Sequence, residues 1–316
     1  MSGVSVFAAT RMTPEFCADL TARFTAHFSN GAWPSLDEAE RAQIRALVTN
    51  GIRGAEKALL DLFPNLEIIA SLGIGVDAID FDVVRARGLV VTNTPNVIAD
   101  DVADLAMGML IDRLRHIIDG DRFVRAGKWS GGPYPLARSL TGKRVGIVGL
   151  GAIGTAIAQR AVTFKLKVKW YGPRPKPQQP HEYVPDLEQL ARDSDVLVIA
   201  CSGGKATRHL IDARIIAALG PTGVLVNVAR GSVVDVEALI AALRAGRLGA
   251  AALDVLERQP EVPAELLALP NVLLTPHLGT NTRETRATMG TMVIANLLAH
   301  FEGRPPPNLV IREPRP

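Results

Sequence analysis

Short hydrophobic runs alternate with helical patterns along the first hundred residues. The runs contain β-branched residues and cover residues 4–8, 46–49, 68–70 and 89–91. Apolar positions at helical spacing predict helices over residues 14–28 and 55–63. Strand-like runs separated by helices are typical of βαβ units, so this part of the chain predicts a parallel sheet.

A long helix and a second series of hydrophobic runs follow. Apolar positions recur at helical spacing from Ile98 to Leu110, and Asp100, Asp101 and Asp104 place negative charge at the positive end of this helix. The later runs lie at residues 145–148, 168–171, 196–199, 224–227 and 272–274. Apart from Lys169 and Asn227 they are continuous apolar runs, as in strands that helices cover on both faces. We therefore expect the α/β class in both parts of the chain.

Length and composition narrow the class of protein. The 316 residues suggest about two domains, and 47% hydrophobic with 21% charged residues is ordinary globular composition. A net charge of +3 gives no basis for nucleic-acid binding, and no apolar run reaches the ~20 residues of a membrane span. Cys17 and Cys201 are too few for a disulfide framework, and the start of the chain lacks a secretory pattern. We therefore expect a cytoplasmic protein.

A glycine motif follows the first strand of the second series. Gly149, Gly151 and Gly154 are spaced as in the dinucleotide fingerprint, between the strand at 145–148 and an expected helix over 152–162. In such motifs the first glycine makes a tight turn, the second lets the backbone approach the pyrophosphate, and the third lets helix and strand pack. The motif therefore predicts a dinucleotide at the helix N-terminus, with a turn that binds nothing as the alternative.

The segment after the next strand bears on the choice between NADP and NAD. Folds that bind NAD usually place an acidic residue about 20 positions after the glycines, where it binds the ribose 2′-hydroxyl. This chain has Arg174 and Lys176 there and no carboxylate. Positive charge attracts a 2′-phosphate. We therefore expect NADP with NAD as the alternative, unless the two side chains form only a solvated basic loop.

Two titratable residues stand at predicted strand ends, where open α/β sheets bind ligands. Arg230 follows the strand at 224–227, and a guanidinium there can bind a carboxylate and polarise a carbonyl. His277 follows the strand at 272–274 and can transfer a proton near neutral pH. Each residue alone is equally compatible with a surface arginine or a satisfied histidine. Clustered metal ligands are absent from the sequence, so we expect no metal.

In this order, the motifs resemble the D-isomer-specific 2-hydroxyacid dehydrogenase family, and the glyoxylate/hydroxypyruvate reductase branch is the most similar. The resemblance spans nearly the whole chain and is strongest from residue 140 to residue 279, where residues 227–231 and 252–255 are specific. It implies two Rossmann-like, doubly wound parallel-sheet domains with the active-site cleft between them. The substrate-binding, flavodoxin-like domain would comprise residues 1–97 and 286–316, and the dinucleotide-binding domain residues 98–285.

The resemblance also implies an activity and a set of site residues. NADPH would reduce a small 2-oxo acid to the D-2-hydroxy acid, Arg230 would bind the substrate carboxylate and carbonyl, and His277 would donate the proton. Backbone amides of Ile74 and Gly75 would hold the carboxylate, with Gly51 beside them. The implied cofactor contacts are Gly149, Gly151, Ala152, Ile153, Gly154, Arg174, Cys201, Thr207, Val228, Asp254 and Gly279. Family members form dimers, so a homodimer is implied, with the long helix and its flanks at the interface.

One residue of the implied catalytic set departs from the family pattern. The family keeps a glutamate, paired with the histidine, five residues after the aspartate that matches Asp254, and this chain has Gln259 there. A carboxylate raises the pKa of a paired histidine, whereas an amide only orients the ring. Three explanations remain open: the histidine has a lower pKa, Glu257 or Glu261 replaces the glutamate, or the reaction needs no proton transfer.

Gln259 also keeps two other functions open. The formate-oxidising branch of the family carries glutamine at this position, but Ile98 stands where that branch has an asparagine, and isoleucine cannot form a hydrogen bond with formate. A catalytically weak scaffold that senses NADP(H) would tolerate the glutamine, but it would not need both Arg230 and His277. We therefore expect a 2-oxo acid reductase, with formate oxidation and cofactor sensing as alternatives.

Overall fold

Two compact units make up the chain. The computed structural model describes residues 3–10, 12–29 and 34–310. Internal contacts divide the chain into a first unit of Met1–Ile98 with Thr280–Pro316 and a second unit of Ala99–Gly279. The last six residues of the predicted substrate domain, 311–316, lie outside the described residues. Within the described ranges, no helix is both long enough and apolar enough to cross a membrane.

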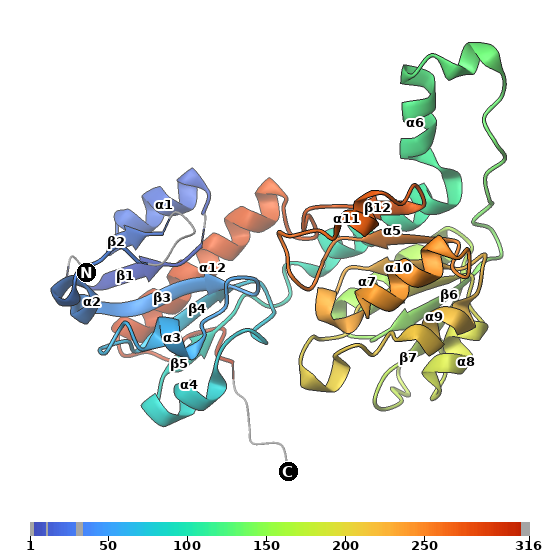
Figure 1. Cartoon of the computed structure of the whole chain (residues 1–316). Helices are drawn as coiled ribbons and strands as arrows, with labels where there is room; N and C mark the ends of the chain where they lie inside the picture. The colour runs from blue at the N-terminus through green and yellow to red at the C-terminus, as the bar shows by residue number, and fades with distance from the viewer. Residues whose placement is uncertain (1–2, 11, 30–33, 311–316) are drawn as a thin grey trace. The chain divides into compact units, whose positions relative to one another are not determined.

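The first unit is built on a five-stranded parallel sheet with the order β2-β1-β3-β4-β5 (Figure 1). The chain starts near the middle of the sheet and winds outward in both directions, which makes the sheet doubly wound. Its strands are β1 (Ser5–Ala8), β2 (Thr25–Phe28), β3 (Ile44–Asn50), β4 (Ile68–Leu72) and β5 (Val90–Thr92). Its helices are α1 (Pro14–Thr21), α2 (Glu38–Gln43), α3 (Lys57–Leu60), α4 (Phe81–Arg87) and α12 (Arg283–Phe301).

The helix predicted over residues 14–28 is wrong in its second half. Helix α1 ends at Thr21, and Thr25–Phe28 forms the edge strand β2, which pairs in parallel with β1. Phe24 is buried and its amide donates to the carbonyl of Leu20, which closes the last turn of the helix. The strand then runs with Thr, Ala, His and Phe, whose partial burial suits an edge position.

The second unit is built on a seven-stranded parallel sheet with the order β12-β11-β10-β9-β6-β7-β8. The two parallel α/β sheets confirm the predicted fold class. The strands are β6 (Arg144–Val148), β7 (Lys167–Tyr171), β8 (Glu182–Tyr183), β9 (Val196–Ile199), β10 (Val224–Asn227), β11 (Ala250–Leu253) and β12 (Val272–Leu274). The helices are α5 (Ala99–Arg115), α6 (Ile117–Arg125), α7 (Ala152–Thr163), α8 (Leu187–Arg192), α9 (Ala213–Leu219), α10 (Val236–Arg244) and α11 (Ala264–Leu267). Short 3-10 turns are η1 (Lys128–Gly131), η2 (Lys205–Thr207) and η3 (Gly231–Val233).

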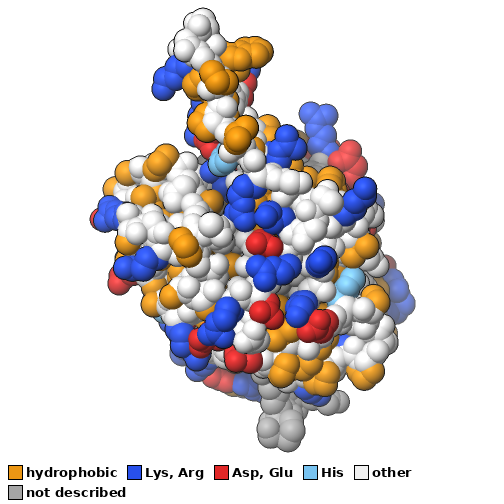
Figure 2. Space-filling model, turned by 90° about the vertical axis from the view of Figure 1, so that its right-hand side faces the viewer, with side chains coloured by type: hydrophobic (Ala, Val, Ile, Leu, Met, Phe, Trp, Pro, Cys, Tyr) orange, Lys and Arg blue, Asp and Glu red, His pale blue; other side chains and the backbone are white. Residues whose placement is uncertain are grey.

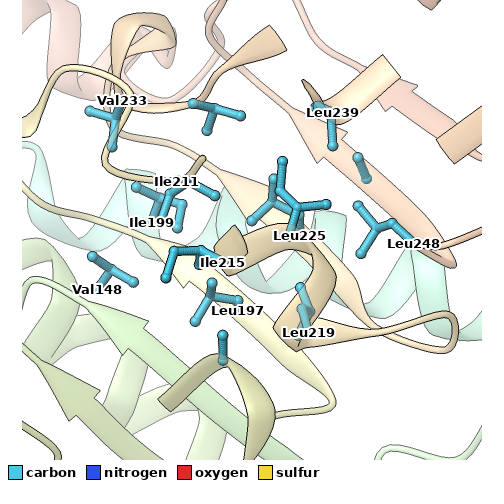
Figure 3. Packing of buried hydrophobic residues seen from close by; sticks show 14 of the residues in the cluster. Val148, Leu197, Ile199, Ile211, Ile215, Leu219, Leu225, Val233, Leu239 and Leu248 are labelled. Atoms are coloured by element: carbon cyan, nitrogen blue, oxygen red, sulfur yellow. The ribbon is translucent and has the colours of Figure 1, made fainter. Parts of the chain in front are cut away.

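Branched aliphatic side chains fill the space between this sheet and its helices (Figure 3). Leu197 and Ile199 of β9 and Leu225 of β10 pack against Ile215 and Leu219 of α9, and all five are buried. Burial of a side chain of this size contributes about 1.5–3 kcal/mol relative to exposure. This packing fixes the strand ends, and with them the starting points of the loops that follow the strands.

A projecting arm, defined here as residues 116–136, leaves the body of the second unit after α5 (Figure 1). Helix α5 ends at Arg115, and His116 takes a left-handed φ of 55° before α6 begins. Figure 2 shows hydrophobic side chains along this arm. The arm therefore carries apolar surface away from the core of its own unit.

A buried ion pair stands at the base of the arm. Arg113 donates from Nη2 to Asp112 Oδ2 at 2.6 Å and to Asp119 Oδ2 of α6 at 3.1 Å. The other oxygen of Asp112 accepts the backbone N–H of Ile118 at 2.8 Å. The Arg113 side chain is 3% exposed and that of Asp112 6%. These contacts fix the direction in which α6 leaves α5.

Candidate active site

The glycine motif forms the turn between β6 and α7. Gly149 has a φ of 95°, and a Cβ there would lie 2.6 Å from the Cα of Cys201, so only glycine fits. A Cβ on Gly154 would lie 2.1 Å from the carbonyl oxygen of Gly149, which closes the helix against the strand. A Cβ on Gly151, by contrast, would meet no atom within 4 Å. Open space at the N-terminus of a twelve-residue helix fits the pyrophosphate of a dinucleotide.

Replacing Gly151 with alanine should weaken dinucleotide binding while leaving the fold intact. Gly151 has extended backbone and its Cβ direction is open, so the free energy of unfolding should change by less than about 0.5 kcal/mol. The methyl group would occupy the space left for the pyrophosphate, and we expect the Kd of NADPH to rise roughly tenfold. Fluorescence titration and thermal unfolding measure the two quantities. Gly154→Ala is the matched control, because its methyl collides with backbone and should lower the Tm instead.

The basic loop after β7 lies beside the glycine motif. Gly149 donates its N–H to the carbonyl of Tyr171, the last residue of β7, at 2.8 Å. Lys176 donates from Nζ to the carbonyl of Leu150, inside the glycine motif, at 2.6 Å. Arg174 is exposed between these two anchors. The positive charges predicted to select a 2′-phosphate are therefore held next to the predicted dinucleotide site.

Several other predicted cofactor residues follow the carboxyl ends of neighbouring strands. Cys201 comes after β9, and burial raises the pKa of its thiol to about 11, so it is a packing residue and not a nucleophile. Thr207 in η2 donates its hydroxyl to the carbonyl of Ser202 at 2.7 Å, which orders the loop after β9. Val228 follows β10 and is buried. Because parallel strands end at one edge, this edge collects the predicted contacts of the second unit.

Arg230 is positioned by an asparagine that the sequence reasoning missed. Asn227, the last residue of β10 and 1% exposed, accepts the N–H of Ala229 and donates from Nδ2 to the carbonyl of Arg230, both at 3.0 Å. The guanidinium donates from Nη1 to the carbonyl of Ala229 at 2.8 Å. A Cβ on Gly231 would lie 2.0 Å from the backbone of Leu256, so this loop packs directly on the segment after β11. A polar amide at the end of an apolar strand was the available cue.

Asp254 organises the loop that carries His277. Its Oδ1 accepts the Thr275 hydroxyl at 2.6 Å and the Leu278 N–H at 2.7 Å, and its Oδ2 accepts the Gly279 N–H at 3.0 Å. His277 lies between these donors with a left-handed φ of 56°, and its own N–H donates to the Asp254 carbonyl at 3.0 Å. Both oxygens of the carboxylate predicted to contact the cofactor thus serve the histidine loop.

Gln259 contacts the ring of His277. Its Nε2 lies 2.9 Å from His277 Nδ1, and its Oε1 accepts the backbone N–H of Leu256 at 3.3 Å. The amide therefore occupies the place where the resemblance implies a glutamate. Neither the contact with Leu256 nor its consequence for the ring was foreseen from the sequence, because a backbone donor leaves no residue-specific pattern.

Glu257, one of the two acids considered as a substitute for that glutamate, has other partners. Its carboxylate pairs with Arg208 and lies 3.3 Å from His209 Nε2. Burial alone would raise the pKa of Glu257, but the hydrogen bonds from Arg208 and His209 outweigh burial and lower it. Glu261 is exposed. The geometry therefore gives Glu257 the task of joining two loops rather than of supporting His277.

The predicted carboxylate-binding segment of the first unit follows β4. Gly73 donates its N–H to Thr94 Oγ1 at 2.8 Å, and Asn93 donates from Nδ2 to the Ile74 carbonyl at 3.1 Å, which fixes the loop. Within the described part of this unit, the amides of Ile74 and Gly75 contact no acceptor. Gly51 begins the turn after β3, where Asn50 Oδ1 accepts the N–H groups of the next residues. Two backbone donors are thus available to an anion.

Among the described residues, no three His, Cys, Asp or Glu side chains come together in a group that could hold a metal ion. The charged groups at the carboxyl edge of the second unit instead pair with one another or with backbone, as Asp254 and Glu257 do. The chemistry offered by this edge is therefore that of an arginine, a histidine and backbone donors beside a dinucleotide-binding turn.

Comparisons with known proteins identify 2-hydroxyacid dehydrogenases and glyoxylate reductases as relatives of this chain. The family described as D-isomer specific 2-hydroxyacid dehydrogenase, NAD binding domain, matches residues 107–279. The chain is 48% identical to glyoxylate/hydroxypyruvate reductase A of Arabidopsis thaliana over 84% of this chain and 85% of that protein. It is 41% identical to the glyoxylate reductase of Thermococcus litoralis over 86% of this chain and 85% of that one.

Two solved structures extend the comparison to the fold. The 2-hydroxyacid dehydrogenase of Ketogulonicigenium vulgare Y25 is 41% identical, with a TM-score of 0.90 over 99% of this chain and 100% of that chain. The NADPH-dependent glyoxylate/hydroxypyruvate reductase of Sinorhizobium meliloti, solved with NADP and malonate, is 35% identical, with a TM-score of 0.92 over 99% of each chain.

Proposed function

Because the chain belongs to the D-isomer-specific 2-hydroxyacid dehydrogenase family, we propose that it reduces small 2-oxo acids of the glyoxylate and hydroxypyruvate type to D-2-hydroxy acids with NADPH. The observation that carries the proposal is the carboxyl edge of one sheet, where the glycine turn, the Arg230 loop and the His277 loop all emerge. The relatives named above as reductases of these acids support the substrate class.

The residues divide the work of the reaction. A nicotinamide cofactor held at the glycine turn of residues 149–154 would supply the hydride that reduces C2 of the substrate. Arg230 binds the substrate carboxylate and polarises the carbonyl with its fixed charge, and His277 holds the carbonyl oxygen and transfers the proton. In the first unit, the amides of Ile74 and Gly75 would be further donors to a carboxylate. Asn227 and Asp254 are positioning residues, because they act through the loops of Arg230 and His277.

A steady-state assay tests this proposal. Purified protein is mixed with glyoxylate or hydroxypyruvate and with NADPH or NADH, and oxidation of the cofactor is followed by absorbance. We expect turnover with both acids. Turnover with neither cofactor would refute the reductase. Oxidation of formate with NADP would instead favour the formate-oxidising alternative, and tight NADPH binding without turnover the sensing scaffold.

Preference for NADPH over NADH is the part of the proposal that depends on Arg174. Its guanidinium is exposed on the loop that Lys176 ties to the glycine motif, where a 2′-phosphate would be bound. Arg174→Ser should raise the KM for NADPH roughly tenfold, as expected for one lost charged hydrogen bond, and leave the KM for NADH unchanged. Arg247→Ser, which removes an exposed arginine after α10, is the matched control. An equal loss with both cofactors would contradict the assignment.

We also propose that the protein is a cytoplasmic homodimer joined through the arm. Five large apolar side chains of the arm are exposed within this chain: Ile117, Ile118, Val124, Trp129 and Leu136. Single exposed apolar residues are ordinary, but several on one projecting segment are typical of an interface. Both cysteines are free, as expected in a reducing compartment.

A further inference from the structure

The amide of Gln259 is held from both ends. Leu256 donates its backbone N–H to Oε1 at 3.3 Å, and Nε2 lies 2.9 Å from His277 Nδ1. A backbone N–H can only donate, so the atom that faces Leu256 must be the oxygen of the amide. The nitrogen of the amide must then face the ring, and it too can only donate.

The ring nitrogen opposite this amide must therefore accept. We infer that Gln259 holds His277 as the neutral imidazole with its proton on Nε2, and that the backbone N–H of Leu256 sets this choice by fixing the orientation of the amide. The inference rests on the proposed function only for its consequence in catalysis. The tautomer itself follows from the two contacts.

The consequence concerns the proton that completes the reduction. Hydride addition places two electrons on the substrate, and the carbonyl oxygen then takes one proton from His277 Nε2. A neutral ring that gave up this proton would become an imidazolate anion, so the productive form is the imidazolium. That form carries a second proton on Nδ1, which would point at the NH₂ group of Gln259. Turning the amide over would relieve this clash but would set the NH₂ group against the N–H of Leu256.

Two acids of the segment after β11, Asp254 and Glu257, have other partners than the His277 ring. From the end of β11, Asp254 accepts three hydrogen bonds from the histidine loop, and Glu257 pairs with Arg208 and His209. An amide on Nδ1 gives an imidazolium none of the stabilisation that a paired glutamate would give it.

The first experiment measures the pH dependence of kcat for glyoxylate reduction. In Gln259→Glu the carboxylate accepts from Nδ1 and stabilises the imidazolium, so the alkaline limb of the profile should move up by about one pH unit or more. Glu257→Gln, in the same segment but away from the ring, is the matched control and should leave the profile in place. An unmoved profile in Gln259→Glu would overturn the inference, whatever its effect on kcat.

The second experiment reads the tautomer directly and needs no activity. Long-range ¹⁵N–¹H spectra of the full chain labelled at histidine distinguish a ring protonated on Nε2 from one protonated on Nδ1, and His277→Asn identifies the signals. We expect the Nε2–H pattern in the parent protein and the doubly protonated pattern at higher pH in Gln259→Glu. An Nδ1–H pattern would overturn the inference even in an active reductase. Absence of turnover would overturn the proposed function, but the spectrum would still decide which ring nitrogen carries the proton.

Discussion

Replacing Arg230 with glutamine is expected to lower kcat/KM for glyoxylate reduction about 10²–10³-fold, the cost of removing one fixed donor to developing charge. Glutamine can still donate a hydrogen bond, but it carries no charge to hold a carboxylate or to polarise a carbonyl. The loss should appear in both kcat and KM, since Arg230 is proposed to bind the substrate and to stabilise the transition state. Steady-state kinetics with NADPH over a range of glyoxylate concentrations measures both.

Two further measurements separate this loss from a general disturbance of the loop. The main chain around Arg230 is fixed by Asn227 and by Gly231, so the Kd of NADPH and the Tm should stay unchanged in Arg230→Gln. Arg247→Gln serves as the matched arginine control and should retain parental kinetics. A variant that lost NADPH binding along with activity would assign Arg230 to the cofactor site instead of to the substrate.

The second large effect is expected at the base of the arm. Arg113→Met should lower the free energy of unfolding by about 3–5 kcal/mol, because it leaves the buried carboxylate of Asp112 without its counter-charge. Methionine retains much of the apolar volume of the side chain, so the cost is that of the ion pair and not of a cavity. Urea unfolding followed by circular dichroism gives the free energy, and sedimentation velocity reports whether the proposed dimer survives.

Asp119, the second acid that Arg113 contacts, provides the control. Arg122 also reaches Asp119, at 3.5 Å, but its side chain is 73% exposed. Arg122→Met should therefore cost less than about 1 kcal/mol and leave the sedimentation coefficient unchanged. If both methionine variants lowered the free energy of unfolding equally, burial would not explain the contribution of the Arg113 contacts to stability. A monomeric but well-folded Arg113→Met protein would place the dimer interface on the arm that this residue orients.

The sheets were predictable where strands carry β-branched residues and less so elsewhere. Strand β9 reads Val-Leu-Val-Ile and was identified, whereas β11, Ala250–Leu253, is mostly alanine and was not. Alanine has no strand preference, and β11 forms because β10 and β12 pair with it on both sides. The edge strand β2 was misread as the end of a helix for a related reason, since four partly exposed residues carry too short a pattern.

The candidate site shows the same division between local and distant information. The glycine turn could be read from sequence, because its three glycines lie within six residues of chain, although the atom that excludes a side chain at Gly149 belongs to Cys201. The task of Asp254 could not, because its partners at residues 275, 278 and 279 are brought to it by the pairing of β11 with β12. Nothing in the local pattern marks the adjacent charges Asp112 and Arg113 as buried, and only the fold shows that they are.

The first unit is assembled from both ends of the chain, and this has a consequence for protein synthesis. Helix α12 packs on β4 and on α1 and buries Met289, Val293 and Leu297, yet it is translated roughly two hundred residues after β4. At about 5–20 residues per second, the ribosome needs roughly 10–40 s to cover that interval. During this time the face of the N-terminal sheet that α12 covers stays exposed. The second unit is continuous in sequence and can complete its own core. A polypeptide truncated before residue 283 should therefore engage chaperones through the first unit and not through the second.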